Sequence, residues 1–409
     1  MPELFERHFS NRARQMKASD VRELLKLLRQ SDMISFAGGF PNTETFPVEL
    51  IREICDDVLK EDGARILQYG ITEGYQPLRE SIAGRMRGKG MDVTDENVLV
   101  VSGSQQVIDL VGKVFIDRGE TMIISAPTYL TALTGFRMYE ASFDPIPIDD
   151  DNMRMDLLEE SLKRHATKGK VPKIVYALPN FQNPAGVTMP EGNRRRLVDL
   201  ANEYDFLVLE DDPYGELRYV GDDIAPIKSF DDEGRVIYMS TFSKILSPGL
   251  RVGWVLADPA ILSKLIIAKQ SADVCTNGLS QAIASEYISR GHVDPQISKI
   301  REIYGRKMRT MLKGMDELMP AELRWIKPEG GMFIWATLPD GLSSVELLDK
   351  AVERKVAFVS GRAFFPDPDD GKSTMRLNFT HPSDEMIIEG LERLAGALET
   401  SIRGLRRTA

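Results

Sequence analysis

The sequence predicts an α/β protein with two domains: a large domain whose mostly parallel sheet is flanked by helices, and a smaller α+β domain. Short apolar runs alternate with helical patterns between about residues 95 and 260, and this alternation changes after about residue 280. In addition, 409 residues are too many for one small hydrophobic core. We expect the large domain at 46–285, and the small domain at 1–45 together with 286–409.

Six short apolar runs are the predicted strands of the large domain. They lie at 98–101, 122–124, 174–178, 206–209, 236–239 and 252–256. Strand, helix, strand at this spacing indicates right-handed crossovers between parallel strands. Ligands of such sheets bind beyond the carboxyl ends of the strands, so we expect the chemistry at that edge. The strands predicted for the small domain lie at 323–326, 332–337, 357–360 and 375–379.

Apolar spacing predicts the helices between these strands. In 105–115, apolar residues recur at the i, i+3, i+4, i+7 positions of one helix face. A further helix is expected after Pro190, a residue that suits the first helical turn. Thr188 and Glu191 have the spacing of a capping box at its start. A long helical stretch is expected over about 280–315.

Composition argues against several classes of function. The formal charge of -10 disfavours a nucleic-acid partner, which needs a clustered basic face. Cys55 and Cys275 form no CxxC pair, and four histidines without an HExxH motif give little basis for a metal site. The N-terminal segment lacks the apolar core of a signal peptide, and no apolar run approaches the ~20 residues of a membrane span. We therefore expect a cytoplasmic protein.

Polar residues follow three of the predicted strands at the expected edge. Ser-Gly-Ser-Gln at 102–105 joins the first strand to its helix, and free N–H groups at a helix start bind anions. Asn183 follows the third strand, and Asp211 ends the fourth, with Tyr214 three residues later. Each of these residues alone is also typical of a cap, a turn or a solvated loop. Their occurrence together indicates a site.

A lysine with phosphate-binding neighbours follows the fifth strand. Thr241 and Ser243 precede Lys244, and Arg251 lies seven residues beyond it. Arginine supplies a permanent forked charge, hydroxyls supply neutral donors, and lysine supplies a nucleophile. This set suits a phosphate group beside a reactive amine. No GxGxxG follows a predicted strand, so a dinucleotide fingerprint is missing.

Taken in chain order, these residues resemble the fold-type I PLP-dependent aminotransferases over nearly the whole chain. Three stretches carry the resemblance: NPAG at 183, EDDPYGEL at 210 and STFSKILSPGLRVGW at 240. SFAGGFPNTETFP, LQYGITEGYQPLR and KPEGGMFIW resemble the branch of 2-aminoadipate, kynurenine and aromatic amino-acid aminotransferases. The resemblance implies a seven-stranded-type sheet and transfer of the α-amino group of an L-amino acid to a 2-oxo acid, with 2-oxoglutarate as the expected acceptor.

The resemblance also implies a role for each site residue. Lys244 would carry the cofactor, pyridoxal 5′-phosphate (PLP), as a Schiff base and later move a proton, and Asp211 would pair with the ring nitrogen. Asn183 and Tyr214 would bind the phenolic oxygen of the ring, and Tyr129 would stack on its face. The implied phosphate ligands are Ser104, Gln105, Thr241, Ser243 and Arg251.

Substrate contacts and a partner chain are implied in the same way. Arg376, in MRLNF, would bind the substrate α-carboxylate with help from Asn183. Gly39 and Arg22 match substrate-contacting positions of the 2-aminoadipate branch, although Arg22 also fits a helix-surface arginine. Tyr69 would reach the phosphate of a neighbouring subunit, which implies a homodimer with shared active sites.

The sequence leaves several alternative functions possible. A β-lyase or a decarboxylase could use the same scaffold, and an aminotransferase-like domain could serve a transcription regulator or a binding protein. The Arg376 match favours an acid substrate that keeps its carboxylate, and the family match begins near residue 20 with no basic segment before it. We expect a broad donor class of 2-aminoadipate, aromatic or leucine-like amino acids.

Overall fold

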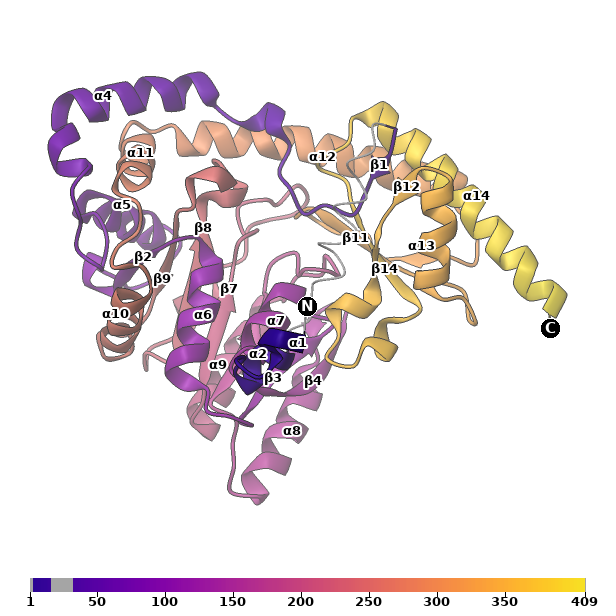
Figure 1. The fold of residues 1–409 in the computed structure, drawn as a ribbon, viewed down its shortest axis with the longest axis horizontal. Helices are drawn as coiled ribbons and strands as arrows, with labels where there is room; N and C mark the ends of the chain where they lie inside the picture. Colours follow the sequence, from indigo (N-terminus) through magenta and orange to yellow (C-terminus); the bar gives the residue numbers. More distant parts are fainter. Residues whose placement is uncertain (1–2, 16–31, 409) are drawn as a thin grey trace.

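The computed structural model describes residues 3–15 and 32–408 (Figure 1). Its helices are α1 Glu3–Glu6, α2 Asn11–Gln15, α4 Val48–Ile66, α5 Gln76–Arg87, α6 Ser104–Phe115, α7 Leu130–Arg137, α8 Met155–Thr167, α9 Glu191–Tyr204, α10 Pro259–Asp273, α11 Gly278–Ser289, α12 Val293–Leu318, α13 Ser344–Glu353 and α14 Asp384–Thr408. Its strands are β1 Ile34–Ser35, β2 Val98–Val101, β3 Thr121–Ala126, β4 Ser142–Asp149, β5 Asn152–Met153, β6 Ile174–Ala177, β7 Leu207–Asp211, β8 Val236–Thr241, β9 Gly253–Leu256, β10 Arg324–Trp325, β11 Phe333–Thr337, β12 Val356–Ala357, β13 Val359–Ser360 and β14 Thr374–Asn378.

The larger sheet has eight strands in the order β2-β9-β8-β7-β6-β3-β4-β5. From β8 to β4 each strand runs parallel to its neighbour, whereas β9 is antiparallel to both β8 and β2. The mostly parallel sheet predicted from the sequence is thus confirmed. The carboxyl ends of β2, β3, β6, β7 and β8 meet at one edge, where β9 begins.

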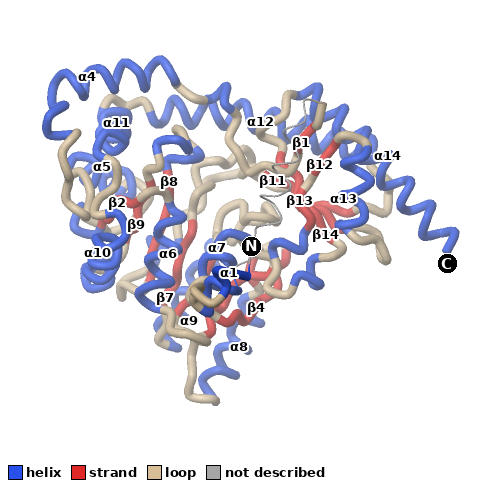
Figure 2. Tube along the Cα trace, viewed as in Figure 1, coloured by secondary structure: helices blue, strands red, loops and turns tan. Residues whose placement is uncertain are grey.

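Helices cover both faces of this sheet (Figure 2). On one face α6, α7 and α10 bury Val111, Leu133 and Leu265 against the strands. On the other face α8 and α9 bury Leu158 and Leu200. Because both faces are covered, the strands read as continuous apolar runs, which is why the sequence revealed them.

The hairpin of β4 and β5 was not predicted. β4 has the sequence SFDPIPID, in which polar residues and two prolines interrupt the apolar pattern. Proline cannot donate a ladder hydrogen bond and is therefore confined to strands near a sheet edge. β4 lies there, with only the two-residue β5 outside it.

Two local predictions are corrected. The long helical stretch expected over 280–315 is divided into two helices, α11 and α12, because the chain turns at Gly291, whose φ of 74° favours glycine. The expected capping box before α9 does not form, since Pro190 occupies the N-cap position. The hydroxyl of Thr188 instead accepts a hydrogen bond from the Phe181 amide at 3.4 Å.

The chain after α11 contains the smaller sheet, whose strand order is β10-β11-β14-β13. Helices α12, α13 and α14 flank this sheet (Figure 1). β1 pairs with β12 and so ties residues 34–35 to this part. The domain division at 46–285 stays a proposal. No helix within residues 3–15 and 32–408 is long and apolar enough to cross a membrane.

Candidate active site at the carboxyl edge of the large sheet

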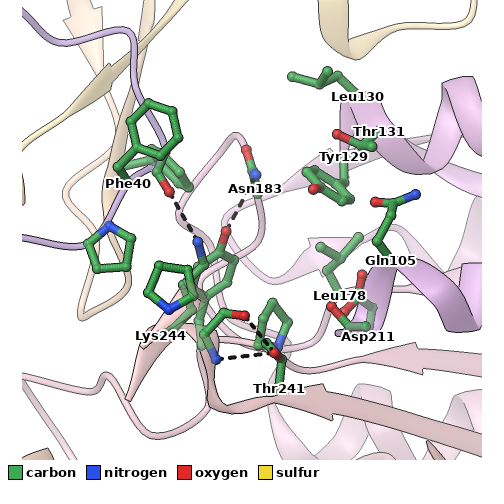
Figure 3. Close-up of a pocket in the computed structure, with 18 of the residues that line it drawn as sticks. Phe40, Gln105, Tyr129, Leu130, Thr131, Leu178, Asn183, Asp211, Thr241 and Lys244 are labelled. Carbon is green, nitrogen blue, oxygen red and sulfur yellow. Dashed lines mark hydrogen bonds between the residues drawn. The ribbon is translucent and has the colours of Figure 1, made fainter. Parts of the chain in front are cut away.

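A cavity of about 380 Å³ opens where the strand ends of the large sheet face β11 and β14 (Figure 3). It brings together twelve of the predicted site residues: Gly39, Ser104, Gln105, Tyr129, Asn183, Asp211, Tyr214, Thr241, Ser243, Lys244, Arg251 and Arg376. These residues come from strand ends, from loops that follow them and from β14. Of the other two, Tyr69 lies outside this cavity and Arg22 lies outside the described residues.

Asp211 ends β7 with its carboxylate buried beneath the cavity. Its Oδ2 accepts a hydrogen bond of 2.6 Å from the hydroxyl of Tyr176, on the adjacent strand β6. Its Oδ1 is buried without a partner among the described residues. Burial raises the pKa of Asp211 to about 7 despite the Tyr176 hydrogen bond, which lowers it. An unpartnered buried carboxylate oxygen is costly, and it marks a place for a cationic or N–H donor.

Lys244 is partly buried in the turn that follows β8. Its Nζ donates a 3.0 Å hydrogen bond to the carbonyl of Gly39 (Figure 3). Burial, with the positive charges of Arg376 and Arg251, lowers the pKa of Lys244 to about 8. A far larger fraction of this amine is therefore neutral, and hence nucleophilic, than of an ordinary lysine near neutral pH.

The turn between β2 and α6 forms a cradle for an anion. The first N–H groups of α6 have no acceptor within the helix, and the positive end of the helix dipole lies there. Gly103 has a φ of 79°, and a side chain at this position would collide with the guanidinium of Arg251. Arg251, also at positive φ, donates to the carbonyl of Ser102 at 3.1 Å. Ser104 begins the helix at the cavity wall.

Hydroxyl groups from the β8 turn complete this end of the cavity. The Oγ atoms of Thr241 and Ser243 lie 2.8 Å apart, and Thr241 also accepts the Ser243 amide at 3.1 Å. A side chain at Gly253, the first residue of β9, would come within 2.8 Å of the Ser104 amide nitrogen. The close approach of β9 therefore requires glycine, and it brings the hydroxyls and the α6 amides together.

Arg376 occupies the opposite end of the cavity, in the middle of β14. Its two terminal nitrogens donate to Asn183 Oδ1 and to the Ala37 carbonyl, each at 2.9 Å. Its guanidinium carbon lies 4.1 Å from the ring centroid of Phe333 and 5.0 Å from that of Phe364. Burial lowers its pKa to about 10, so it still carries its charge near neutral pH.

Asn183 and Tyr214 connect the two ends. Asn183 Nδ2 donates to the Tyr214 hydroxyl oxygen at 3.5 Å, while its Oδ1 is held by Arg376. Tyr214 packs edge-on against Phe333, and burial raises its pKa. Tyr129 lies at the start of α7 on the cavity wall, and burial raises the pKa of this phenol too. Both phenols are therefore protonated near neutral pH.

Tyr69 does not reach the cavity of its own chain. It lies between α4 and α5 with 82% of its side chain exposed, and Leu67 and Ile71 beside it are also exposed. Arg22 lies outside the described residues. Within those residues, no group of three or more His, Cys, Asp or Glu side chains is placed to hold a metal ion.

Several residues of the site were missed by the sequence reading. Tyr176 lies inside the apolar strand predicted at 174–178, where a buried tyrosine needs a partner for its hydroxyl. Phe333 falls in a predicted strand without a predicted role and Phe364 falls outside the predicted strands, yet both flank the Arg376 guanidinium. Phe40 and Leu130 extend the apolar wall of the cavity (Figure 3).

Comparison with known families decides the chemistry. Residues 31–394 match the model of the class I and II aminotransferases. The chain belongs to this family. Its members are PLP-dependent transaminases, and this protein is one.

Three relatives cover almost the whole chain. The chain is 52% identical to aromatic-amino-acid aminotransferase 1 of Thermococcus litoralis over 98% of this chain and 96% of that one. The chain is also similar to a kynurenine aminotransferase of Pyrococcus horikoshii, whose crystal structure was determined in complex with PMP. The sequence identity is 49% and the TM-score is 0.93, over 97% of this chain and 98% of that one. An α-aminoadipate aminotransferase of Thermus thermophilus with bound N-(5′-phosphopyridoxyl)-L-leucine is 39% identical, with a TM-score of 0.90, over 98% and 99%.

The residues of this chain fit PLP. The buried unpartnered Oδ1 of Asp211 matches a protonated ring nitrogen, and the low pKa of Lys244 matches a reactive amine. The cradle at Gly103 and Arg251 matches a phosphate. Nε of Arg376 is buried without a partner among the described residues, which matches a carboxylate ligand.

Proposed function

We propose that the cavity holds PLP between the anion cradle and Asp211, and that the substrate carboxylate binds Arg376. When bound, PLP supplies an aldehyde that captures the amine and a ring that withdraws electrons from the substrate Cα. The observation that carries the proposal is Asp211 Oδ1, a buried oxygen that has no partner among the described residues, on a residue that lines the same cavity as Lys244. The proposed phosphate ligands are Ser104, Gln105, Thr241, Ser243 and Arg251.

Lys244 and Asp211 would handle the protons. Because the pKa of Lys244 is lowered to about 8, its Nζ can accept a proton from one atom of the substrate and return it to another. Asp211 would keep a proton on the ring nitrogen through charge and hydrogen bonding. Tyr176 donates to the other carboxylate oxygen and so leaves Oδ1 available to a ligand.

Arg376, Asn183, Tyr214 and Tyr129 would orient the ligands. The Arg376 guanidinium is fixed by two hydrogen bonds and two aromatic rings, so a carboxylate bound to it has one position. Asn183, already bonded to Arg376 and Tyr214, links the carboxylate position to that of the ring's phenolic oxygen. Tyr129 offers its aromatic face to the ring.

The test compares two aspartates that each accept a tyrosine hydroxyl at 2.6 Å. Asp211→Asn should retain PLP but lose about a hundredfold or more in kcat, since a neutral amide cannot hold the ring proton. The control Asp109→Asn, which neutralises a carboxylate that accepts the Tyr139 hydroxyl on the surface, should keep the wild-type rate. PLP content is read by absorbance and kcat by turnover with 2-oxoglutarate. A near wild-type rate for Asp211→Asn contradicts the assignment.

We propose a broad donor class of aromatic, leucine-like and 2-aminoadipate substrates, with 2-oxoglutarate as acceptor. Phe40, Leu130 and Phe333 give the described cavity an apolar wall that suits uncharged side chains. An acidic side chain needs a further cation once it leaves water, and we propose Arg22 for this role. Arg22→Ala should lower kcat/KM for 2-aminoadipate roughly tenfold to a hundredfold and barely change that for phenylalanine. Equal losses for both donors contradict it.

We also propose a homodimer with shared active sites. Leu67, Tyr69 and Ile71 expose 71%, 82% and 57% of their surfaces within five residues of chain, and exposed apolar residues gathered in this way indicate a contact surface. Mixing Lys244→Ala with Tyr69→Phe subunits should restore activity in one site of each mixed dimer. Light scattering gives the oligomeric state. No recovery despite subunit exchange contradicts shared sites. A cytoplasmic location stays a prediction.

A further inference from the structure

A cluster of polar side chains lies behind the anion cradle, outside the cavity. Asp273 is the last residue of α10, which lies against α6 (Figure 1). Its Oδ2 accepts hydrogen bonds from Ser102 Oγ at 3.0 Å and from Gln106 Nε2 at 2.8 Å. The other end of Gln106 accepts the Ser102 amide at 2.8 Å. Asp273 thus holds the chain immediately before Gly103.

The charge on Asp273 is kept by a buried lysine. Lys269, one turn earlier in α10, donates to Asp273 Oδ1 at 2.6 Å, and its side chain is fully buried. Burial alone would raise the pKa of Asp273, but hydrogen bonds from Lys269, Gln106 and Ser102 lower it. A buried lysine that points at a carboxylate is costly to maintain, so the pair is unlike an ordinary surface ion pair.

The backbone after Asp273 is strained. Val274 has φ 64° and ψ -60°, and the Cys275 amide donates to the Asp273 carbonyl at 2.7 Å. These values define the rare γ-turn with positive φ, which a β-branched residue adopts only when its surroundings force it. Strain of this kind persists where neighbouring contacts over-determine the chain, and it gathers at functional sites.

The residues on either side of the strained turn each contact the end of β2 or the loop that follows it. Before it, Asp273 binds Ser102. After it, the Thr276 hydroxyl donates to the Val100 carbonyl at 3.3 Å. The turn therefore fixes α10 on the end of β2, and the aspartate cannot move away from the loop without breaking one of these contacts.

Ser102 is consequently held by all of its polar groups. The Gln106 side chain accepts a hydrogen bond from the Ser102 amide, and Asp273 accepts one from its hydroxyl. Arg251 donates a hydrogen bond to the Ser102 carbonyl. Ser102 does not line the cavity, whereas Ser104 and Arg251 do. A shift of Ser102 would displace both the α6 amides and the arginine, so contacts on its outer side act on the phosphate position.

We propose that Asp273 is a positioning residue for the phosphate cradle, held in place by Lys269 and by the strained turn at Val274. We expect its effect to be specific to the phosphomonoester of the cofactor, because the side chains that Asp273 contacts (Ser102, Gln106 and Lys269) lie outside the cavity, and Ser102 joins them to the cradle. The inference rests on the proposed function, in which Ser104 and Arg251 bind that phosphate. It predicts that Asp273 governs how tightly PLP is held relative to pyridoxal, which lacks the phosphate.

The experiment titrates apoprotein with PLP and with pyridoxal and compares the two dissociation constants. Asp273→Asn should weaken PLP about tenfold and change pyridoxal by less than about twofold. Ser102→Ala, which removes one donor and perturbs folding less, should weaken PLP about threefold with the same selectivity. The control Asp316→Asn removes a surface carboxylate paired with Lys327 at 3.2 Å and should change neither constant.

Arg251→Ala distinguishes a failure of the proposed phosphate site from a failure of the proposed role of Asp273. If it weakens PLP selectively while Asp273→Asn and Ser102→Ala do not, the phosphate site stands and the role of Asp273 is wrong. If Asp273→Asn weakens PLP and pyridoxal by the same factor, Asp273 is a general structural residue, which also overturns the inference. If Arg251→Ala itself shows no selectivity, the phosphate lies elsewhere and the proposed function fails with it.

Discussion

The two arginines of the cavity lie in opposite surroundings. Arg376 is buried, lies close to the rings of two phenylalanines, and is fixed by Asn183 and the Ala37 carbonyl. Arg251 is exposed, and its described hydrogen bonds go to the carbonyls of Ser102 and Pro248. A buried fixed guanidinium discriminates strongly between ligands, because any anion that misses its geometry leaves charge unpaired. An exposed one adds attraction that water and salt weaken.

The largest effect is expected at the buried arginine. Arg376→Lys should lower kcat/KM for every amino acid by about a hundredfold or more, since a point charge cannot replace a planar fork that also holds Asn183. PLP should remain bound. Turnover and cofactor content are measured on the same preparation. A fall of less than about threefold would remove the distinction between the two arginines.

A smaller and different effect is expected at the exposed arginine. Arg251→Ala should weaken PLP roughly tenfold while kcat at saturating PLP changes by less than about threefold. Added salt sharpens the contrast. It should weaken PLP binding to the wild type more than it raises KM for phenylalanine, because exposed charges are screened more than buried ones. The reverse salt dependence would contradict the assignment of the two ends.

The smallest effect is expected on the pKa of Lys244. Burial is the main cause that lowers this pKa, and the charges of Arg376 and Arg251 lower it further. The neutral amine is the reactive form, so the rate at which apoprotein captures pyridoxal should rise with pH through about 8. Arg376→Met should move this midpoint upward, because a positive neighbour is lost. Arg251→Ala should move it upward by less, because the charge of Arg251 is solvated. A larger shift from Arg251 would contradict this order.

The sequence located this site because its main residues follow strands. Asp211 and Lys244 come directly after apolar runs, and parallel strands bring their ends to one edge. Tyr176 could not be placed in the same way, because its role depends on the pairing of β6 with β7. Asp273 lies 170 residues beyond Gly103 in the chain, and only the packing of α10 on α6 brings them together.

Predictions from short sequence patterns were wrong where the backbone conformation, and not the residue types in the pattern, decides the local structure. Thr188 and Glu191 have the spacing of a capping box, yet Pro190 takes the cap position. The apolar spacing over 280–315 runs on through Gly291, although that glycine is the signal for the break. A strained residue such as Val274 leaves no mark in the sequence, because a valine there looks like any other.

The backbone carbonyls of Ala37 and Gly39 already accept hydrogen bonds from Arg376 and Lys244. An arriving amino acid would find one unpartnered donor of these two side chains among the described residues, Arg376 Nε, and would have to displace these two carbonyls from the other donors. The gain on binding is the difference between two sets of contacts, and a typical hydrogen-bond exchange is worth only about 1 kcal/mol. A departing 2-oxo acid is replaced by the same carbonyls. A site of this kind favours rapid exchange of substrate and product over tight retention of either, which suits the proposed function, in which the amino acid and the 2-oxo acid both bind Arg376.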